Sequence, residues 1–569
     1  MKHVLRLSPL LLLGATAPTS PVTRIDYALT PDITGGAIRS LIVEARFTAG
    51  ATGIVGFGWQ RSWGGSATLG RYARDFAVDG ASSITADGDR HFRIVARPGA
   101  ALTVRYRVVS GYDAYPALQD FERAVPVIRP TWFTALGYDL FGFPDDSQAW
   151  PATFAWTKAP KDMVLVSDLQ HLPTRATEAR PLGTVDDVLH STLVGGSDLS
   201  VYDDSRGSGL RIAALPAAVQ STDALYRLSR QIAGAERTFW NDSRPRPYVI
   251  TASPVPRKPG SRYLSGANFG DAFGLWLNAD AAPVDIAYLL AHEYGHNWIP
   301  GTLGHTFEVD GQEQREAWLG EGFTDYFALA IALRSGAIDV RDFLDLWNGI
   351  LLQYAISPAR NMPGDAAATA FFTNAFAEKL PYPRGAMLAA RWAQQLRAHG
   401  NKTDLRRILL AQMRVARGSV ETPAPLFVKT AKSQGLVVAD DIKRFVVQGE
   451  TIMLAPDTFG PCATVVTERR PAFERGYDAE ATAASKNTVV GVVPGSAAYR
   501  AGLRNGMTIQ SRKAGKPGDS MTPFTLVITN DGTVRELTYL PQGKSMQIVQ
   551  QIRPLRRFQG CRKSISGLS

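Results

Sequence analysis

His292 and His296 are four residues apart, and Glu293 directly follows the first histidine in the run His-Glu-Tyr-Gly-His. On a helix, residues at this spacing share one face, so both imidazoles can reach a single metal ion. A carboxylate one residue after the first histidine faces a water molecule on the metal and can act as its general base. The pattern predicts a metal-dependent hydrolytic site with His292 and His296 as ligands and Glu293 as a catalytic residue.

A catalytic zinc site needs a third protein ligand and one position left open for water. The carboxylates that follow the motif are the candidates, and they are Glu308, Asp310, Glu313, Glu316 and Glu321. Glu321 is favoured because its segment, residues 318–326, is largely apolar, and a buried carboxylate needs a partner. Asp325, one helical turn later, is expected to accept a hydrogen bond from the far nitrogen of a ligand histidine. Two imidazoles and one carboxylate suit one Zn²⁺ ion.

The elements that must position these residues are helices. Apolar spacing of 3.6 residues, together with Gly and Pro at the ends, indicates that residues 216–452 form a mainly helical domain. The expected helices cover residues 223–240, 283–298, 314–335, 341–356, 384–399 and 404–417, with short strands at 248–251 and 273–277. Pro283 occupies a favoured first-turn position of the helix that carries the histidines.

The two flanking regions are richer in β-type patterns. Residues 21–215 contain short alternating or β-branched runs, at 38–47, 92–96, 102–109, 163–166 and 210–215, separated by turn residues, which predicts an N-terminal β-sandwich. Similar runs at 488–493, 524–529 and 536–540 predict a small β domain over residues 453–569. The fold class expected from these patterns is α+β with several domains.

The motifs resemble a known family. HEYGHNW followed by WLGEGFTDYF is similar to the glycyl aminopeptidase family of zinc metallopeptidases, relatives of thermolysin and aminopeptidase N. The resemblance implies an N-terminal β domain, a thermolysin-like catalytic domain and a C-terminal PDZ domain, in the order of the three regions above. It also implies that His292, His296 and Glu321 bind zinc, that Glu293 is the general base and acid, and that peptides are the substrates.

Tyr382 extends the resemblance. Related aminopeptidases carry a Tyr-x-Lys-Gly segment whose tyrosine donates a hydrogen bond to the developing oxyanion, and here the segment reads Tyr-Pro-Arg-Gly, with Arg384 in place of the lysine. A phenol near the metal would stabilise charge that appears only in the transition state. Tyr382 is therefore expected to be the second catalytic residue, at the start of a helix.

Substrate contacts are expected before and along the strand at residues 273–277, which is predicted to be an edge strand that pairs with an extended peptide. The family carries there a glycine-rich segment with a glutamate that binds the free amino group of the substrate. The corresponding residues 265–273 have the glycines but no glutamate, and Asp271 is the available substitute. The substrate-binding candidates are Gly266, Asn268, Asp271 and Phe273.

The C-terminal region resembles bacterial PDZ domains in the run Val-Pro-Gly-Ser-Ala-Ala at 493–498 and in Ala501-Gly502-Leu503. The loop with Gly476 and Tyr477 is the candidate receptor of a peptide C-terminus, because its backbone N–H groups could bind a carboxylate. A PDZ-like domain that packs on the catalytic domain without a ligand is the alternative.

The ends of the chain suggest an exported protein, periplasmic or secreted. Residues 1–20 have a short basic start, an apolar stretch and an Ala-Thr-Ala cleavage pattern, as in a signal peptide. Cys462 and Cys561, the two cysteines of the chain, bracket the last hundred residues and are expected to form a disulfide in an oxidising compartment.

Composition excludes several other classes. The 62 Lys and Arg residues exceed the 52 Asp and Glu residues by ten, but they are scattered, and no basic block typical of nucleic-acid binding occurs. No uncharged apolar run has the ~18 residues of a membrane-spanning helix.

Two alternative functions stay open. One is an endopeptidase or dipeptide-releasing peptidase on the same site, and the other is a non-catalytic PDZ-based binding protein with a vestigial metal site.

Overall fold

The computed structural model describes residues 24–569, apart from the gaps given at the end of this paragraph. The predicted signal segment, residues 1–20, lies outside the described residues, and so do the candidate ligands Glu308 and Asp310. The gaps are residues 64–65, 68, 115–120, 172–182, 205–207, 217, 244–246, 256–262, 279–280, 306–310, 401–402, 556–560 and 562–569.

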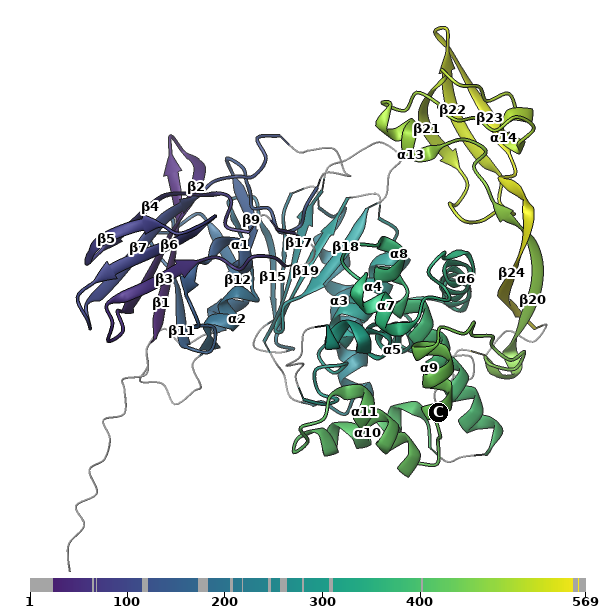
Figure 1. Ribbon diagram of the computed structural model, residues 1–569, viewed down its shortest axis with the longest axis horizontal. Coiled ribbons are helices and arrows are strands. Elements are labelled where there is room, and N and C mark those ends of the chain that lie inside the picture. Colours follow the sequence, from purple (N-terminus) through teal and green to yellow (C-terminus); the bar gives the residue numbers. More distant parts are fainter. Residues whose placement is uncertain are drawn as a thin grey trace, which may run out of the picture.

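The N-terminal region consists of β-sheets, at one end of the molecule in Figure 1. Its strands are β1 (Ile25–Thr34), β2 (Ala37–Thr48), β3 (Ile54–Gly58), β4 (Ala73–Asp79), β5 (Ala81–Ala86), β6 (His91–Ala96), β7 (Ala101–Val108), β8 (Val127–Ile128), β9 (Trp132–Leu136), β10 (Phe143–Pro144), β11 (Pro151–Trp156), β12 (Val164–Ser167), β13 (Gly183–Thr184) and β14 (Thr192–Gly196). They form sheets in the orders β13-β11-β1-β2-β7-β4, β10-β3-β6-β5 and β12-β14-β9-β8. In β2 the odd-numbered residues 41–47 are buried, so the alternating pattern of the sequence places one face on a common core.

A five-stranded sheet joins this region to the helices. Its strands are β15 (Ser200–Asp204), β16 (Leu210–Ala214), β17 (Tyr248–Pro254), β18 (Leu264–Asn268) and β19 (Ala272–Leu277), in the order β15-β16-β17-β19-β18. In β19, Phe273 and Leu275 pack on the helical side, whereas Ala272 and Trp276 pack on the N-terminal core. Both faces of the sheet are therefore covered, which explains why its strands are continuously apolar rather than alternating.

Two sequence-based expectations are corrected by this sheet. The predicted division at residue 215 is wrong, because β15 and β16 pair with β17 in the sheet that carries the helices. Residues 273–277 do not form an edge strand, since β19 lies between β17 and β18. The edge strand is β18, which runs antiparallel to β19.

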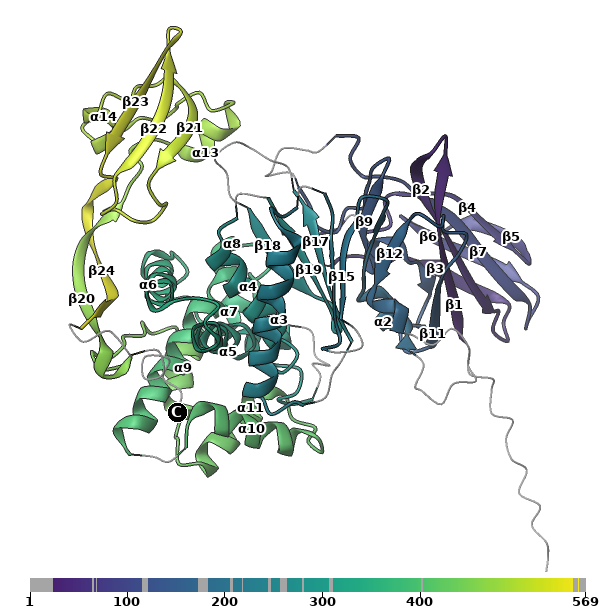
Figure 2. The same cartoon turned by 180° about the vertical axis from the view of Figure 1, so that it is seen from behind.

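The central region is helical, as the apolar spacing predicts. Helices α1 (Gly137–Leu140) and α2 (Val185–Leu189) belong to the N-terminal region, and those of the central region are α3 (Thr222–Phe239), α4 (Pro283–Gly295), α5 (Gln312–Ser335), α6 (Val340–Ile356), α7 (Gly364–Thr369), α8 (Ala375–Lys379), α9 (Pro381–Ala398), α10 (Leu405–Ala416), α11 (Pro423–Ser433) and α12 (Ala439–Asp441). Figure 2 shows α3 and α4 beside the five-stranded sheet, where α3 contacts β15 and β16 and α4 contacts β18. In the described residues, no helix is both long and apolar enough to cross a bilayer.

The C-terminal region forms two small sheets. β20 (Ala463–Phe473) and β24 (Gln542–Pro554) pair as a long ribbon, and β21 (Thr508–Ala514), β22 (Phe524–Asn530) and β23 (Thr533–Tyr539) form a three-stranded sheet with α13 (Ala479–Ala484) and α14 (Ala497–Arg500). The ribbon packs on α6, where Asn348 exchanges two hydrogen bonds with the backbone of Ile552. The expected disulfide between Cys462 and Cys561 is present at the base of the ribbon.

Candidate metal centre

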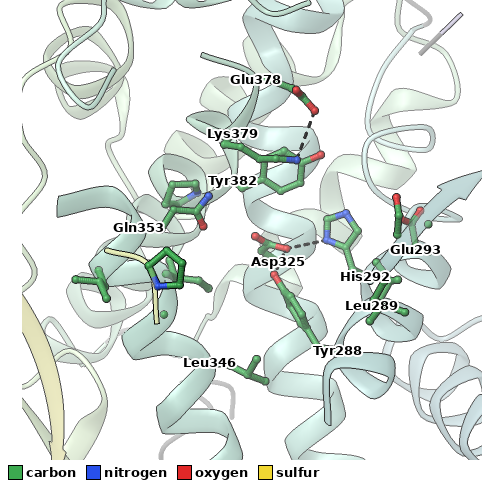
Figure 3. Close-up of a pocket in the computed structure, with 18 of the residues that line it drawn as sticks. Tyr288, Leu289, His292, Glu293, Asp325, Leu346, Gln353, Glu378, Lys379 and Tyr382 are labelled. Carbon is green, nitrogen blue, oxygen red and sulfur yellow. Dashed lines mark hydrogen bonds and ion pairs between the residues drawn. The ribbon is translucent and has the colours of Figure 1, made fainter. Parts of the chain in front are cut away.

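Helix α4 carries the two histidines. It begins at Pro283, as expected, and packs between the edge strand β18 and helix α5. His292 and Glu293 are 6% and 8% exposed, so the helix holds an imidazole and a carboxylate that are almost fully buried. Figure 3 shows both side chains beside a cavity whose other labelled residues come from α4 itself and from α5, α6, α8 and α9.

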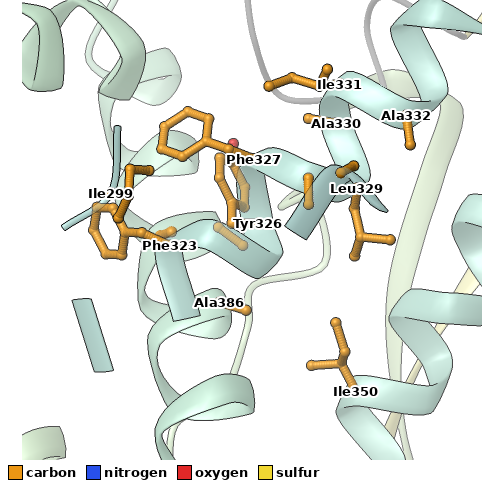
Figure 4. Packing of buried hydrophobic residues seen from close by; sticks show 14 of the residues in the cluster. Ile299, Phe323, Tyr326, Phe327, Leu329, Ala330, Ile331, Ala332, Ile350 and Ala386 are labelled. Atoms are coloured by element: carbon orange, nitrogen blue, oxygen red, sulfur yellow. The ribbon is translucent and has the colours of Figure 1, made fainter. Parts of the chain in front are cut away.

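Helix α5 supplies the carboxylates and is buried almost throughout. From Glu316 to Leu333 nearly every side chain is inaccessible, which is why the segment lacks a polar face in the sequence. Figure 4 shows Phe323, Tyr326 and Phe327 of this helix packed among aliphatic side chains of neighbouring segments. A helix fixed on all sides in this way holds its few polar side chains in defined positions.

Two glycines set the distance between α5 and α9. A Cβ atom at Gly322 would lie 2.4 Å from the Cα of Gly385, and one at Gly385 would lie 1.7 Å from the carbonyl oxygen of Trp318. The helices therefore cross in direct backbone contact, which requires glycine at both positions. Tyr382, one turn before Gly385, is brought to the same site as Glu321 by this contact.

The three predicted ligands converge. Glu321 Oε2 lies 3.2 Å from His292 Nε2 and 3.6 Å from His296 Nε2, and the two Nε2 atoms are 3.1 Å apart. One ligand atom from each of the three residues lies within 4.8 Å of the other two. Among the described residues, no other group of three or more His, Cys, Asp or Glu side chains has ligand atoms this close together.

The second nitrogen of each imidazole is already engaged. His292 Nδ1 lies 2.8 Å from Asp325 Oδ1, and His296 Nδ1 lies 2.9 Å from the carbonyl oxygen of Ile299. Both acceptors require a proton on Nδ1, which leaves the lone pair of Nε2 for a metal. Asp325 also accepts a hydrogen bond from the hydroxyl of Tyr288. The donor set fits zinc, because the Nε2 atoms of two imidazoles and a carboxylate oxygen face one point.

The electrostatics of Glu321 agree with an ionised ligand. Burial alone would raise the pKa of Glu321, but the imidazoles of His296 and His292 outweigh it and hold the pKa below its usual range. Burial raises the pKa of Glu293, and the charge of Glu321 adds to this. The imidazoles and Arg123 act in the opposite direction on Glu293. Of the two carboxylates, Glu293 is thus the one suited to take up and release a proton.

The other candidate ligands are placed elsewhere. Glu316 is buried and accepts hydrogen bonds from the hydroxyl of Thr422 and the backbone N–H of Ala424, so it ties α11 to α5. Glu313 is exposed in the first turn of α5 and is not part of the convergent group. Among the described carboxylates downstream of the motif, Glu321 alone meets the two histidines.

Tyr382 lies where the sequence predicts it, in the first turn of α9, and lines the cavity. Its ring stacks on that of His292 with centroids 5.9 Å apart. Burial raises the pKa of Tyr382 well above its usual value, and the charges of Glu321 and Asp325 raise it further, so the phenol keeps its proton. Arg384 lies away from the cavity, where its Nη2 donates to the carbonyl oxygen of Met362 at 2.7 Å.

The edge strand β18 forms one wall of the cavity. Leu264, Ser265 and Gly266 line it, and Gly266 faces Glu293. Asn268 Nδ2 donates to the carbonyl oxygen of Glu293 at 3.1 Å, which fastens the strand to α4. The contact between backbone and carboxylate at Gly266 therefore depends on the absence of a side chain there.

Gly266→Ala is expected to lower kcat by at least about tenfold without loss of bound metal, since displacing a reacting group by about 1 Å can cost up to 10²-fold. The new Cβ would lie 2.6 Å from Glu293 Oε1 and 2.5 Å from the ring of Phe273. Steady-state kinetics with metal analysis measure this. Gly234→Ala on α3, where a Cβ meets nothing within 4 Å, is the control. Unchanged kcat in Gly266→Ala would contradict the placement of Glu293.

Two predicted substrate residues do not reach the cavity. Phe273 is 1% exposed in the core and supports Gly266 from behind, so direct contact with a substrate is excluded by burial. Asp271 is exposed in the turn between β18 and β19 and is not among the residues that line the cavity. The carboxylate of Asp271 therefore does not lie beside Glu293.

Sequence reasoning missed residues that come from outside the helical region. The cavity, of about 610 Å³, is also lined by Arg123 from the N-terminal region and by Lys516 and Pro517 from the C-terminal region. Their sequence surroundings carry no recognisable motif. They can be identified only from the tertiary structure, which brings three distant segments together around α4.

Glu236, on α3, is a buried carboxylate behind the metal helix. Its Oε2 accepts a hydrogen bond of 2.8 Å from Trp240 Nε1, and its Oε1 has no hydrogen-bond partner among the described residues. Burial raises the pKa of Glu236 to about 8, although Trp240 and His292 act to lower it. At neutral pH the folded chain thus holds a proton that an unfolded glutamate releases.

Glu236→Gln is expected to raise the free energy of unfolding at pH 7 by up to about 3 kcal/mol, because glutamine is buried without taking up a proton. The gain amounts to about 1.4 kcal/mol for each pH unit above the ordinary pKa of glutamate. In the wild-type protein, the proton on Glu236 contributes fully to the free energy of unfolding below pH 4.5. This contribution is lost as the pH rises from there toward about 8. At pH 4.5 the two proteins should be equally stable. Urea denaturation of EDTA-treated protein at both pH values tests this, and an equal difference at both would contradict it.

The predicted peptide-binding loop of the C-terminal region is packed within that region. Gly476 has a φ of +78°, and its carbonyl oxygen accepts a hydrogen bond from the backbone N–H of Val493 at 2.9 Å. Tyr477 is half-buried against the small core of the region, which includes Leu503 and Phe524. The binding of a peptide C-terminus by this loop stays a prediction.

Comparison with known proteins agrees with this site. Residues 285–381 match the profile of the family described as M61 glycyl aminopeptidase. A solved aminopeptidase N family protein from Idiomarina loihiensis is similar in fold, with a TM-score of 0.67 and 14% identity over 95% of this chain and 100% of that one. An M1 zinc metallopeptidase from Deinococcus radiodurans gives a TM-score of 0.46 and 16% identity over 76% of this chain and 95% of that one. No curated protein matches the chain. The family resemblance recognised in the motifs is confirmed for residues 285–381, which match this family of metallopeptidases and contain His292, Glu293, His296 and Glu321.

Proposed function

We propose that the chain hydrolyses peptides as a zinc aminopeptidase in which His292, His296 and Glu321 hold one Zn²⁺ ion. The observation that carries the proposal is the convergence of one ligand atom from each of these side chains within 4.8 Å, next to the cavity that His292 and Glu293 line. A bound zinc ion would supply Lewis acidity toward the scissile carbonyl and a lowered pKa for water.

The residues of the chain then perform the proton transfers. Glu293, nearly buried and with a raised pKa, removes the proton from the attacking water and delivers it to the leaving amine. Asp325 keeps His292 in the tautomer that presents Nε2 to the site. Tyr382 donates a hydrogen bond to the carbonyl oxygen as that oxygen gains negative charge.

Tyr382→Phe is expected to lower kcat by about 10²- to 10³-fold, the effect of losing one oxyanion donor, with KM little changed. The phenol retains its proton because its pKa is raised, so it can donate throughout the neutral range. Steady-state kinetics on one peptide substrate provide the comparison. If KM rises while kcat stays constant, Tyr382 binds the substrate rather than the transition state.

The edge strand β18 is the proposed binding element for the peptide backbone. In the described part of the chain its outer edge has no neighbouring strand, so the N–H and C=O groups of that edge, apart from the Gly266 carbonyl bound by Arg123, can pair with an extended substrate. Gly266 lets this backbone approach Glu293, and Asn268 holds the strand to α4.

N-terminal acetylation tests the aminopeptidase assignment. A free-amine peptide should be cut from its N-terminus by the zinc-loaded protein, and its N-acetylated form should be cut at least about tenfold more slowly, because a bound ammonium group contributes a charge-assisted interaction. Equal rates for both peptides would instead identify an endopeptidase. Release of dipeptides, seen by mass spectrometry, would identify the dipeptide-releasing alternative.

The regions around the catalytic segment have proposed roles as well. We infer three parts after a signal peptide: an N-terminal β domain, the helical peptidase domain, and a PDZ-like domain that begins near residue 453. The separate small core of the C-terminal region supports the last of these. Export to the periplasm or the exterior is supported by the Cys462–Cys561 disulfide, because such bonds persist in oxidising compartments.

A further inference from the structure

Arg123 brings a positive charge from the N-terminal region onto the edge strand β18. Its Nη1 donates to the carbonyl oxygen of Gly266 at 2.7 Å and to the hydroxyl of Ser265 at 3.1 Å. The guanidinium also lies 6.0 Å from the ring centroid of Trp276, which helps to fix it. Both acceptors are neutral, so these contacts position the charge without cancelling it.

Two of the three carboxylates that line the cavity are bound to other partners, and the third, Glu293, lies close enough to Arg123 for the guanidinium to lower its pKa. Asp325 is bound by His292 and Tyr288, and Glu378 pairs with Lys379 at 3.4 Å. Arg123 itself forms no ion pair with a carboxylate in the described part of the chain, and its hydrogen bonds go to the two neutral oxygens above. Its Nε and Nη2 make no hydrogen bond there either, which leaves donors for a ligand.

The position of this charge matters because β18 is the strand along which the peptide is proposed to lie. Where the sequence suggested a carboxylate that would attract an ammonium group, the strand instead presents a guanidinium next to Gly266 and Glu293. A guanidinium with free N–H groups binds carboxylates in a planar, bidentate way and repels cations. The cavity is therefore built to accept an acidic group close to the reacting bond.

We propose that Arg123 binds the side-chain carboxylate of a substrate residue beside the scissile bond, so that the enzyme prefers peptides with Asp or Glu at that position. The proposal rests on the proposed peptidase function and adds a substrate class to it. Arg123 acts as a specificity residue, because it meets the substrate side chain and takes no part in the proton transfers.

The test compares peptides that differ only in charge. The zinc-loaded full-length protein is given Asp-Ala-Ala and Asn-Ala-Ala, then Ala-Asp-Ala and Ala-Asn-Ala, and kcat/KM is measured for each. In one of the two pairs the Asp peptide should be preferred by at least about tenfold, and Arg123→Gln should reduce that ratio by about 10- to 100-fold. Arg123→Lys, which keeps the positive charge but cannot bind a carboxylate through two parallel N–H groups, should retain part of the preference.

Arg129→Gln is the matched control. Arg129 belongs to the same region and also donates from Nη1 to a hydroxyl, that of Ser110, and to a carbonyl oxygen, that of Tyr112. It does not line the cavity, so the preference for Asp should be unchanged. Equal losses for Asp and Asn peptides in Arg123→Gln would overturn the proposal, because they would show that Arg123 only supports β18. A wild-type protein without a preference for Asp would overturn it as well.

A binding measurement separates this proposal from the peptidase function. Calorimetry on the Glu293→Gln protein gives Kd for the same peptides without turnover. The acidic peptides should bind more tightly than their Asn counterparts, and the difference should vanish when Arg123→Gln is added. If this holds while the wild-type protein cuts no peptide, the hydrolase function fails and the acidic site stands. If the difference is absent, the acidic site fails whatever the activity.

Discussion

Glu293→Gln should lower kcat by about 10²- to 10⁴-fold, the range attributed to one general acid–base group, while zinc content and peptide affinity stay close to those of the wild type. Glutamine has the shape of glutamate but cannot take up a proton. Glu293 is 8% exposed and faces Gly266, so the amide fits the same space without disturbing His292 or His296. Zinc analysis and steady-state kinetics on one preparation measure both quantities.

Glu378→Gln is a suitable control for that experiment. Glu378 lines the same cavity, but it pairs with Lys379 at its exposed side and does not face the metal ligands. Its kcat should stay within about threefold of the wild type, as for an exposed ion pair. An unaltered kcat in Glu293→Gln would show that Glu293 is not the general base. If that variant also retained the cellular role of the protein, the non-catalytic binding alternative would be favoured.

Glu321→Gln should reduce zinc affinity by at least about 100-fold and abolish hydrolysis at limiting metal. Loss of a hydrogen-bond partner of a metal ligand commonly costs 10- to 100-fold in affinity, and loss of a ligand should cost no less. Glu321 Oε2 is the one carboxylate oxygen near both Nε2 atoms, and the imidazoles hold its pKa below the usual range. A neutral amide at this position removes the negative charge of the site.

Competition with a chelator of known affinity measures the change. Glu313→Gln, on the exposed first turn of the same helix, should bind zinc like the wild type. Should Glu321→Gln keep wild-type affinity, the third ligand would have to be another group, and the role assigned to α5 would be wrong.

Much of the site could be predicted because its pattern is local. The spacing of His292 and His296 on one helix, and of Glu321 and Asp325 on another, follows from helix geometry alone. The structure confirms both helices, as α4 and α5, and places Asp325 on His292. The buried character of α5 was also readable, since its segment has no polar face.

The arrangement of strands was less predictable, because strand order is not a local property. The apolar runs of β16 and β19 identify strands, but nothing in them says that β15 and β16 join the central sheet or that β18 lies outside β19. The segment 488–493 was predicted to be a strand from its β-branched residues. That prediction was wrong: the structure has isolated bridges at Thr488 and Val490, and Gly491 with a φ of +68° interrupts the pairing.

The contributions of Arg123 and Lys516 to the cavity could not be predicted at all. Arg123 meets Gly266 across 143 residues of sequence, and Lys516 reaches α6 from a domain connected by the ribbon β20–β24. Such contacts depend on how three regions pack together. Neither residue lies in a motif, so the identity of its neighbours is set only by the tertiary structure.

X-ray absorption spectroscopy of the zinc-loaded protein identifies the atoms that bind the metal. We expect one zinc per chain with two imidazole nitrogens at about 2.0–2.1 Å and the remaining ligands oxygen at about 2.0–2.2 Å, because His292, His296 and Glu321 are the ligands and one position is left to water. A spectrum with a single imidazole, or a protein that binds no zinc, would contradict it.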